Sequence, residues 1–206
     1  MSIDKLALDN FHLSKLTKER DYCGLVQLVK PLLFLSQYDS PRCGPYSIAM
    51  ALSYWLPKFN ENKIGDVVAK EMTYHFRDNG ILNGTTFPKG IKKYLQKYNF
   101  NNMSFKNSEF ELLKRFIWAG VPCITLSARK NNIWRQHYNV AVAFDDSQEK
   151  IYFNDSKVKY KKNNRPGNLV LDYGQFLSQW NKAGYYLLKK WFLPVFPLVL
   201  SKTTHS

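Results

Sequence analysis

The sequence predicts an α+β fold in which a helical N-terminal half packs against an antiparallel β-sheet formed by the C-terminal half. Two observations support this prediction. Up to Gly120, apolar side chains recur mostly at the three- and four-residue spacing of a helix face. From Cys123 onward, short apolar runs with the two-residue period of strands take over. Because helices come first and strands second, we expect the two halves to face each other.

Four helices are expected in the first half. Residues 45–56 (PYSIAMALSYWL) are rich in helix-forming side chains, and the run stops before Pro57, which cannot continue a helix. Two amphipathic helices follow, because apolar side chains recur at helical spacing in two groups. The groups are Ile64, Val67, Val68 and Met72, and then Phe87, Ile91, Tyr94, Leu95 and Tyr98. The fourth helix is expected to begin at a capping box of Ser108 and Glu111 and to end at Gly120.

Strands dominate the second half. Three short runs are expected to be strands: residues 123–127, 138–144 and 151–154. The polar residues 145–147 (DDS) separate the last two runs and predict an antiparallel hairpin. A short helix is then expected to begin at Asp172, and residues 184–192 are expected to return as a final strand.

The length and composition are those of one compact domain. The chain has 206 residues, of which 45% are hydrophobic and 22% charged, so it can bury enough apolar surface to fold. We expect a single domain over residues 1–206 with a core at about 33–191, a helical N-terminal extension and an apolar C-terminal tail. The 30 Lys and Arg against 16 Asp and Glu give a net charge of +14, which indicates an anionic partner: nucleic acid, an acidic membrane surface or an acidic protein.

The cysteine content favours a reducing compartment. Cys23, Cys43 and Cys123 are an odd number at wide spacings, so no disulfide framework is expected. The N-terminus has no apolar run of signal-peptide length, and no stretch reaches the roughly 18 apolar residues of a membrane helix. A cytoplasmic location is therefore expected, with peripheral attachment to a membrane as the alternative. Cys23 and Cys123 have no motif around them and are expected to serve in packing.

Cys43 lies at the start of the first strong helix, followed by Gly44 and Pro45. A thiol acts as a nucleophile only as the thiolate, and the partial positive charge at a helix N-terminus lowers its pKa. A small buried core cysteine is the alternative. Gly44 suits a nucleophile position, because a side chain there would crowd an acyl group approaching the sulfur; the flexibility of a helix start would also explain it.

His137 and Asp155 are brought together by the predicted hairpin. His137 heads the alternating strand HYNVAVAF, and Asp155 ends the next strand in IYFND. A cysteine at a helix start, a histidine at a strand start and an acid on the neighbouring strand is the arrangement of a thiol hydrolase. A surface histidine and a simple Asn-Asp turn are the alternatives.

Three motifs in a fixed order carry a resemblance to a known family. They are Q-x5-C-G-P-x-S-x-A-M-A-L at residues 37–52, H-Y-N-V-A-V at 137–142 and Y-F-N-D at 152–155. The set resembles the bacteriocin-leader-processing, double-glycine cysteine peptidases and their stand-alone relatives, which have the papain-like fold. The similarity covers residues 33–191 and implies a bacterial thiol protease.

The resemblance implies a role for each matching residue. Cys43 corresponds to the nucleophile and His137 to the general base and later acid. Asp155 corresponds to the residue that orients His137. Gln37 would stabilise the oxyanion together with the backbone N–H of Cys43. Ser156 departs from the family, which usually has proline after the aspartate, and is expected to loosen the loop while keeping the carboxylate.

The function implied is cleavage of a peptide or amide bond through a thioester on Cys43. Two alternatives stay open: acyl transfer from the same thioester to an amine, and a peptide- or membrane-binding module without turnover. The retained residues Cys43, His137 and Asp155 argue against the binding-only version. The substrate is expected to be a peptide or an acyl-carrier-type protein. Leader peptidases of this family are usually fused to a transporter, and this sequence has neither membrane spans nor a P-loop, so its substrate is expected to differ from a double-glycine leader.

Other features of the sequence are compatible with binding to an anionic surface but do not indicate a metal site. No CxxC, HExxH or acidic ligand cluster occurs, so neither a metal nor another cofactor is expected. Nucleic acid is not the expected partner, since the basic residues do not interleave with aromatic ones. The basic tract 157–165 is either a solvated loop or a flank of the cleft that attracts an acidic substrate. Residues 191–200 (WFLPVFPLVL) either pack on the core or contact an anionic membrane. The oligomeric state has no signature in the sequence.

Overall fold

The computed structural model describes residues 24–28, 30–37, 40–61, 63–74, 85–158 and 166–198. Its helices are α1 (Cys43–Ser53), α2 (Ile64–Tyr74), α4 (Pro88–Lys97), α5 (Phe110–Trp118) and α6 (Tyr173–Asn181). Its strands are β1 (Leu25–Gln27), β2 (Cys123–Ala128), β3 (Gln136–Asp145), β4 (Lys150–Asn154), β5 (Leu169–Asp172) and β6 (Phe192–Pro194). Short 3-10 turns are η2 (Pro57–Phe59), η3 (Arg129–Asn131) and η4 (Ala183–Tyr186). The four helices expected in the first half are present, and the α+β prediction is confirmed.

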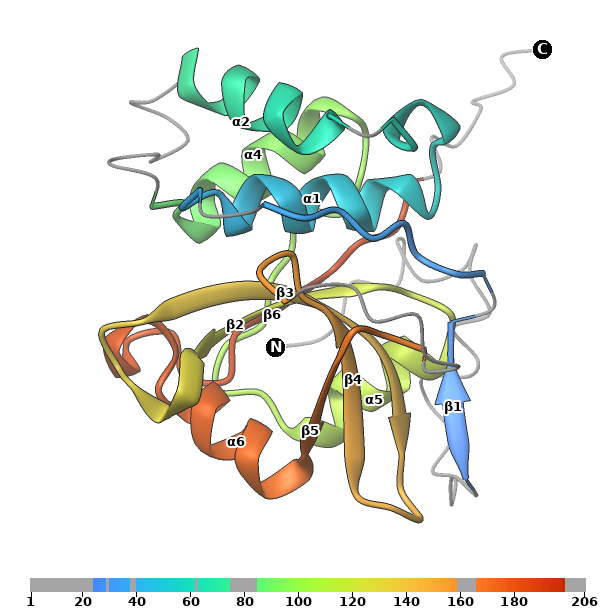
Figure 1. Cartoon of the computed structure of the whole chain (residues 1–206), viewed down its shortest axis with the longest axis vertical. Coiled ribbons are helices and arrows are strands. Elements are labelled where there is room, and N and C mark those ends of the chain that lie inside the picture. The colour runs from blue at the N-terminus through green and yellow to red at the C-terminus, as the bar shows by residue number, and fades with distance from the viewer. Residues whose placement is uncertain are drawn as a thin grey trace, which may run out of the picture.

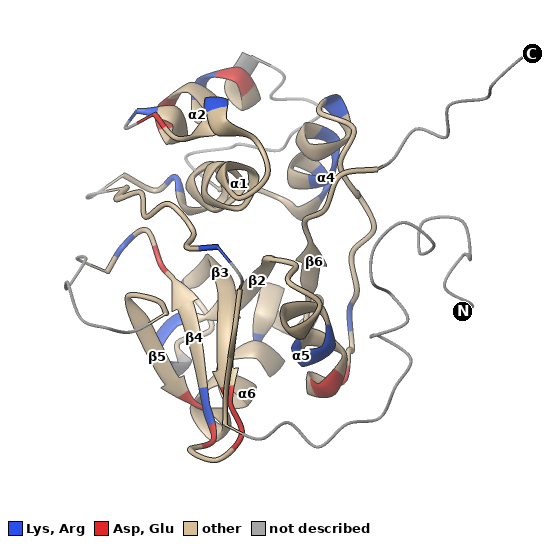
Figure 2. Ribbon diagram, turned by 90° about the vertical axis from the view of Figure 1, so that its right-hand side faces the viewer, with Lys and Arg blue, Asp and Glu red and all other residues tan. Residues whose placement is uncertain are grey.

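The elements form three layers (Figure 1). Helices α1, α2 and α4 lie on one face of the sheet, and α5 and α6 lie on the other. The sheet has the strand order β5-β4-β3-β2-β6, and β1 pairs with the far end of β3. All of these pairings are antiparallel. Figure 2 shows α1 between α2 and α4 above the sheet.

The alternation of strand residues explains the two cores. On β2, Ile124 and Leu126 pack with α1, α2 and α4, whereas Cys123 packs with α5 and α6 on the opposite face. Cys123 is fully buried, as expected of a packing cysteine. A register shift on β3 between Ala141 and Ala143 marks a β-bulge. The central strands are therefore covered on both faces, which explains their almost continuous apolar sequence.

The C-terminal segment 191–196 packs inside the molecule. Its side chains are at most 7% exposed, and β6 pairs with β2. The indole N–H of Trp55 donates to the carbonyl of Val195 at 2.7 Å, and that of Trp180 donates to the carbonyl of Trp191 at 2.8 Å. Core packing is therefore observed for residues 191–196, whose six side chains are not available to a membrane surface, whereas Leu198 is 40% exposed. Residues 199–200 and the expected N-terminal helical extension lie outside the described residues.

Two local predictions are wrong. The expected capping box is absent: α5 begins at Phe110 after Glu109, with no side-chain cap. The N–H of Asn107 instead donates to the carbonyl of Lys189, and Ser108 is buried. The expected strand 184–192 is also wrong, because its first residues form η4 and only its last residue belongs to β6. There the chain turns through positive φ angles at Gly184, Tyr185 and Tyr186.

In the described part of the chain, no helix combines the length and the apolar character needed to cross a bilayer.

Candidate active site

Cys43 is the first residue of α1, and it occupies the interface between the helical layer and the sheet. The N–H of Tyr46 donates to the carbonyl of Arg42 at 3.1 Å, and Pro45 has no N–H to donate. Within the described residues, the N–H groups of Cys43 and Gly44 have no acceptor. The first turn of α1 therefore presents two free donors and the positive end of the helix dipole beside the thiol.

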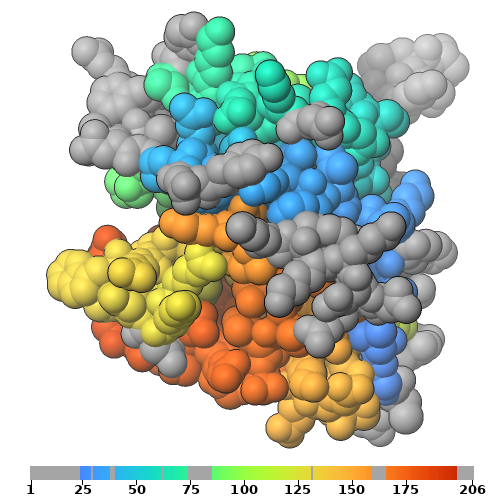
Figure 3. Space-filling view, viewed as in Figure 1, coloured from blue at the N-terminus to red at the C-terminus, as the bar shows by residue number. Residues whose placement is uncertain are grey.

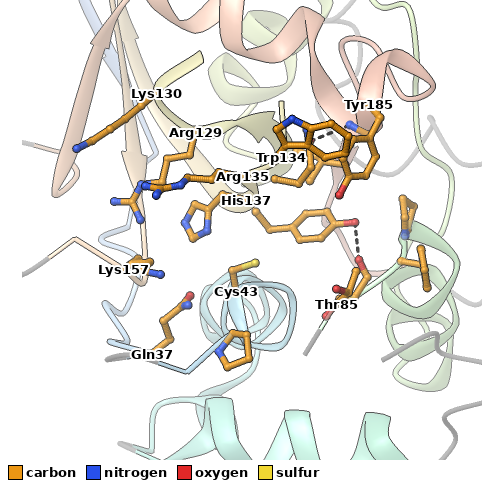
Figure 4. Close-up of a pocket in the computed structure, with 18 of the residues that line it drawn as sticks. Gln37, Cys43, Thr85, Arg129, Lys130, Trp134, Arg135, His137, Lys157 and Tyr185 are labelled. Carbon is orange, nitrogen blue, oxygen red and sulfur yellow. Dashed lines mark hydrogen bonds between the residues drawn. The ribbon is translucent and has the colours of Figure 1, made fainter. Parts of the chain in front are cut away.

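His137 is the second residue of β3 and faces Cys43 across the layer interface (Figure 4). Asp155 follows the last residue of β4, and it is 1% exposed. The Nε2–H of His137 donates to Oδ1 of Asp155 at 2.7 Å. That oxygen also accepts the backbone N–H of Lys157 at 2.8 Å. Because Nε2 is bound to Asp155, the other ring nitrogen, Nδ1, is left for the thiol.

The three side chains shift each other's pKa values. Burial raises the pKa of the Cys43 thiol, but its hydrogen bond to His137, the imidazolium charge and the backbone of Tyr138 outweigh burial and lower it. Burial lowers the pKa of His137, but hydrogen bonds to Asp155 and Cys43 and their charges raise it to about 9. Burial raises the pKa of Asp155, while His137, the Lys157 N–H and Arg129 bring it below its usual value. The arrangement thus favours a thiolate beside an imidazolium.

Gln37 lines the same cleft and is 3% exposed. Its Nε2 donates to the carbonyl of Ser40 at 2.5 Å, and its Oε1 accepts a hydrogen bond from the Ser156 hydroxyl. The second hydrogen of Nε2 is not used by Ser40. The structure therefore brings together all four residues that the sequence singled out, with Gln37 and Cys43 on one side of the cleft and His137 on the other (Figure 4).

Ser156 was expected to loosen the loop after Asp155, but its hydrogen bonds to Gln37 stabilise that loop. It is fully buried, its hydroxyl binds Gln37, and its carbonyl accepts the Gln37 backbone N–H at 2.9 Å. The neighbouring Asp155 is held by Asn168, whose Oδ1 accepts the Asp155 N–H and whose Nδ2 donates to the Asp155 carbonyl, both at 2.8 Å. Asn168 was not singled out from the sequence, since it lies 13 residues beyond Asp155 and in no motif.

Gly44 is required by packing on Thr86. A Cβ at Gly44 would lie 2.5 Å from both Cβ and Oγ1 of Thr86, far inside van der Waals contact. The nearest obstacle to a side chain is therefore Thr86, rather than an approaching acyl group. The Thr86 hydroxyl is buried, lines the cleft and has no hydrogen-bond partner within the described residues.

These residues surround a cleft of about 660 Å³. Lys157 lines it, so this member of the basic tract flanks the site; residues 159–165 of the tract, like Cys23, lie outside the described residues. The connection between β2 and β3, which contributes residues to the cleft, is yellow in Figure 3 and projects at one side of the molecule, below the helical layer. Within the described residues, no group of three or more His, Cys, Asp or Glu could hold a metal.

Comparisons with known proteins give the family. The family model described as "Peptidase_C39 like family" matches residues 29–188. No curated protein matches the chain significantly. A putative C39-like peptidase from Bacillus anthracis has a similar structure, with 14% identity, a TM-score of 0.57 and coverage of 83% of this chain and 97% of that one.

Two further structures are similar. A double glycine motif protease from an AMS/PCAT transporter, in complex with the leader peptide, has 18% identity, a TM-score of 0.51 and coverage of 84% of this chain and 98% of that one. The peptidase domain of Streptococcus ComA, a bi-functional ABC transporter, has 19% identity, a TM-score of 0.51 and coverage of 80% and 97%. These likenesses confirm the papain-like fold. Since the family model covers most of the sequence, the chain belongs to the Peptidase_C39-like family of cysteine peptidases.

Proposed function

We propose that this protein cleaves a peptide bond through a thioester on Cys43. The observation that carries the proposal is the position of His137, which contacts the Cys43 thiol on one side and the Asp155 carboxylate on the other. The lowered pKa of Cys43 and the raised pKa of His137 support a thiolate–imidazolium pair. A thiolate is the form of cysteine that attacks a carbonyl carbon.

The first half-reaction forms the thioester. The sulfur of Cys43 bonds to the carbonyl carbon, and the electron pair of the C=O bond moves to oxygen. When that oxyanion collapses, the C–N bond breaks, and the imidazolium of His137 gives its Nδ1 proton to the leaving amine. Asp155 accepts the Nε2–H throughout, so the ring keeps its orientation and the imidazolium is stabilised.

The oxyanion needs donors that are already in place. The backbone N–H of Cys43 is free within the described residues, and the second hydrogen of Gln37 Nε2 is available on the same side of the cleft. We assign these two groups to the oxyanion. Removing one such donor from a hydrolase slows the reaction by about 10²- to 10³-fold.

The second half-reaction decides between hydrolysis and transfer. In hydrolysis, neutral His137 takes a proton from water as the water oxygen attacks the thioester, and the thiolate leaves as the carboxylic acid forms. If an amine takes the place of water, the same steps give acyl transfer. We propose hydrolysis as the main reaction, since the peptidase family matches the chain.

A peptide is the proposed substrate. One of the similar structures, the double glycine motif protease, is in complex with a leader peptide. The cleft beside Cys43 is about 660 Å³ in volume, within the range of roughly 300–1,000 Å³ that is typical of ligand-binding clefts.

The test is intact-mass analysis of the protein incubated with a peptide library derived from a proteome, with and without an added amine. We expect Cys43-dependent cleavage, a Cys43 acyl adduct on rapid quenching, and loss of both in Cys43→Ala. Cys123→Ala is the matched control, because Cys123 is buried away from the cleft and should not be needed. Products carrying the amine would favour the transferase. If there is no cleavage, no adduct and no labelling by an epoxide warhead, both enzyme proposals are wrong and the protein is a peptide-binding module.

A further inference from the structure

The cleft has a basic side and an aromatic rim (Figure 4). Trp134 and Tyr185 form the rim; their rings are 5.7 Å apart, and the two residues are 78% and 50% exposed. On the other side of the cleft, four cationic residues line it. This basic wall consists of Arg129, Lys130, Arg135 and Lys157. Within the described residues, no Asp or Glu lines the cleft.

The basic wall is built from two separate segments. One is the connection between β2 and β3, which is closed on itself by backbone hydrogen bonds. The N–H of Arg129 donates to the carbonyl of Arg135 at 2.7 Å, and the N–H of Arg135 donates to the carbonyl of Asn132 at 3.0 Å. The other is the turn after β4, where the backbone N–H of Lys157 is bound to Asp155. Backbone hydrogen bonds therefore fix both segments from which the four cationic side chains extend.

Most of this positive charge has no acidic partner. The nearest acid is Asp155, whose Oδ2 lies 4.0 Å from Nη2 of Arg129. That carboxylate already serves His137. Within the described residues, Lys130, Arg135 and Lys157 make no ion pair. Figure 2 shows acidic residues at the turn joining β3 and β4, at the far end of the sheet, and others on α2 and α5.

Unpaired cations at the wall of a partly closed cleft create a positive potential where a substrate binds, because low-dielectric walls weaken screening by solvent. Exposed cations elsewhere on a surface interact weakly with ligands, since salt screens them beyond about 8–10 Å. Here two arginines and two lysines line one cleft that also holds the reacting groups.

We propose that the basic wall is a substrate subsite that binds a carboxylate, and that the substrate peptide carries Asp or Glu close to the cleaved bond. The inference rests on the proposed function, which it makes more specific. Arg135 and Lys157 are the principal binding groups, because Arg129 is already near Asp155. Arginine can hold the carboxylate through two parallel hydrogen bonds, and lysine supplies a second charge.

The first test needs no substrate. Iodoacetate carries a carboxylate and iodoacetamide does not, so the ratio of their alkylation rates at Cys43 measures the local field. At low salt we expect this ratio to fall about three- to tenfold in Arg135→Gln/Lys157→Gln, and the difference from wild type to shrink at high salt. Lys106→Gln is the matched control, since Lys106 is exposed and does not line the cleft. An unchanged ratio in the double variant would overturn the subsite.

The second test reads the substrate. Cleavage sites made in a proteome-derived peptide library should be enriched in Asp or Glu within a few residues of the cut, and the double variant should lose that enrichment. Cuts confined to one or two residues from a C-terminus would identify the terminal carboxylate as the bound group. Cleavage without any acidic preference overturns the subsite and leaves the peptidase proposal intact. A changed alkylation ratio in a protein that cleaves nothing supports the anion subsite and removes the peptidase proposal.

Discussion

The hydroxyl of Ser156 donates a hydrogen bond to Oε1 of Gln37, while the Gln37 backbone N–H donates to the Ser156 carbonyl at 2.9 Å. Ser156 follows Asp155 directly in the sequence. One residue therefore links the turn that carries the proposed triad acid to the proposed oxyanion donor. With its Oε1 held by Ser156, the amide of Gln37 keeps its NH₂ group turned toward Ser40 and the cleft.

Ser156→Ala should lower kcat more than it raises KM, by about three- to tenfold, because the Gln37 amide loses the bond that sets its orientation. Gln37→Ala should cost about 10²-fold. Alkylation of Cys43 by iodoacetamide forms no oxyanion, so it reports separately on the thiolate. A positioning role predicts a slower peptidase reaction with little change in alkylation, and rescue by Ser156→Thr. Equal losses in both reactions would indicate general damage to the fold.

The pH profile of Cys43 alkylation should show an ion pair. The reactive thiolate forms as pH rises through the pKa of Cys43, which His137 lowers from the ordinary thiol value of 9.0. A second change is expected as His137 loses its proton near pH 9. In His137→Ala, burial acts on the thiol without the imidazolium, so the rate at neutral pH should drop by at least tenfold. A mutant profile that overlays the wild type would contradict the pair.

The same shift predicts how stability depends on pH. The folded state raises the pKa of His137 from 6.5 to about 9, so it binds the proton more tightly than the unfolded chain. This contribution is complete below pH 6.5 and is lost as pH rises through 9. The lowered pKa of Cys43 contributes with the opposite sign over the same range, so the measurement uses a chain without that thiol. Chemical unfolding from pH 6 to 10 should show Cys43→Ala losing more stability than Cys43→Ala/His137→Gln. Parallel curves would show that the imidazolium is not stabilised by folding.

Asn168→Ala should weaken the hold on Asp155. It removes hydrogen bonds to the N–H and carbonyl of Asp155 and to the carbonyl of Val158, all at 2.8 Å. We expect a loss of about 1–3 kcal/mol in the free energy of unfolding and a several-fold loss of kcat. Asn102→Ala is the comparison variant. Asn102 lies before α5 and does not line the cleft, so this variant should keep wild-type activity. Full activity in Asn168→Ala would mean that β4 alone positions Asp155.

Gly44→Ala should destabilise the protein by about 1–3 kcal/mol, because the new Cβ would lie 2.5 Å from the Thr86 side chain. Thr86→Gly removes every atom of that clash. In a double-mutant cycle, Gly44→Ala should therefore cost much less in the Thr86→Gly background than in wild type. Additive costs would place the requirement for glycine in the helix start itself.

The sequence predicted correctly those helices and strands whose structure depends mainly on their own residues. The hairpin of β3 and β4 follows from two short apolar runs on either side of a polar turn. The hairpin predicted that His137 and Asp155 lie close together, and the family resemblance added Cys43 to them as the nucleophile. Geometry then added what no local pattern holds: the three bonds from Asn168 and the contact of Gly44 with Thr86.

The failures involve segments determined by distant partners. β1 and β5 are three and four residues long, and each pairs with a strand that does not adjoin it in sequence: β1 pairs with the distant β3, and β5 pairs with β4 across residues 155–168. Residues 184–192 contain strand-forming residues, yet the N–H of Lys190 donates to the carbonyl of Trp180 and keeps the chain turned back on α6. The capping box at Ser108 failed for the same reason, since the backbone before α5 is bound to the C-terminal segment.

The proposed nucleophile and its base belong to different layers: Cys43 starts α1, and His137 lies in β3. Within the described residues, no disulfide or strand pairing joins α1 to β3, so the separation of the two side chains depends on the packing of α1 against the sheet in the core that contains Ile48 and Val140. The rate of turnover therefore depends on how accurately α1 packs against the sheet. A small displacement of α1 relative to the sheet would abolish activity while every helix and strand stayed intact. In a denaturant titration, activity should therefore be lost at a lower denaturant concentration than the circular dichroism signal.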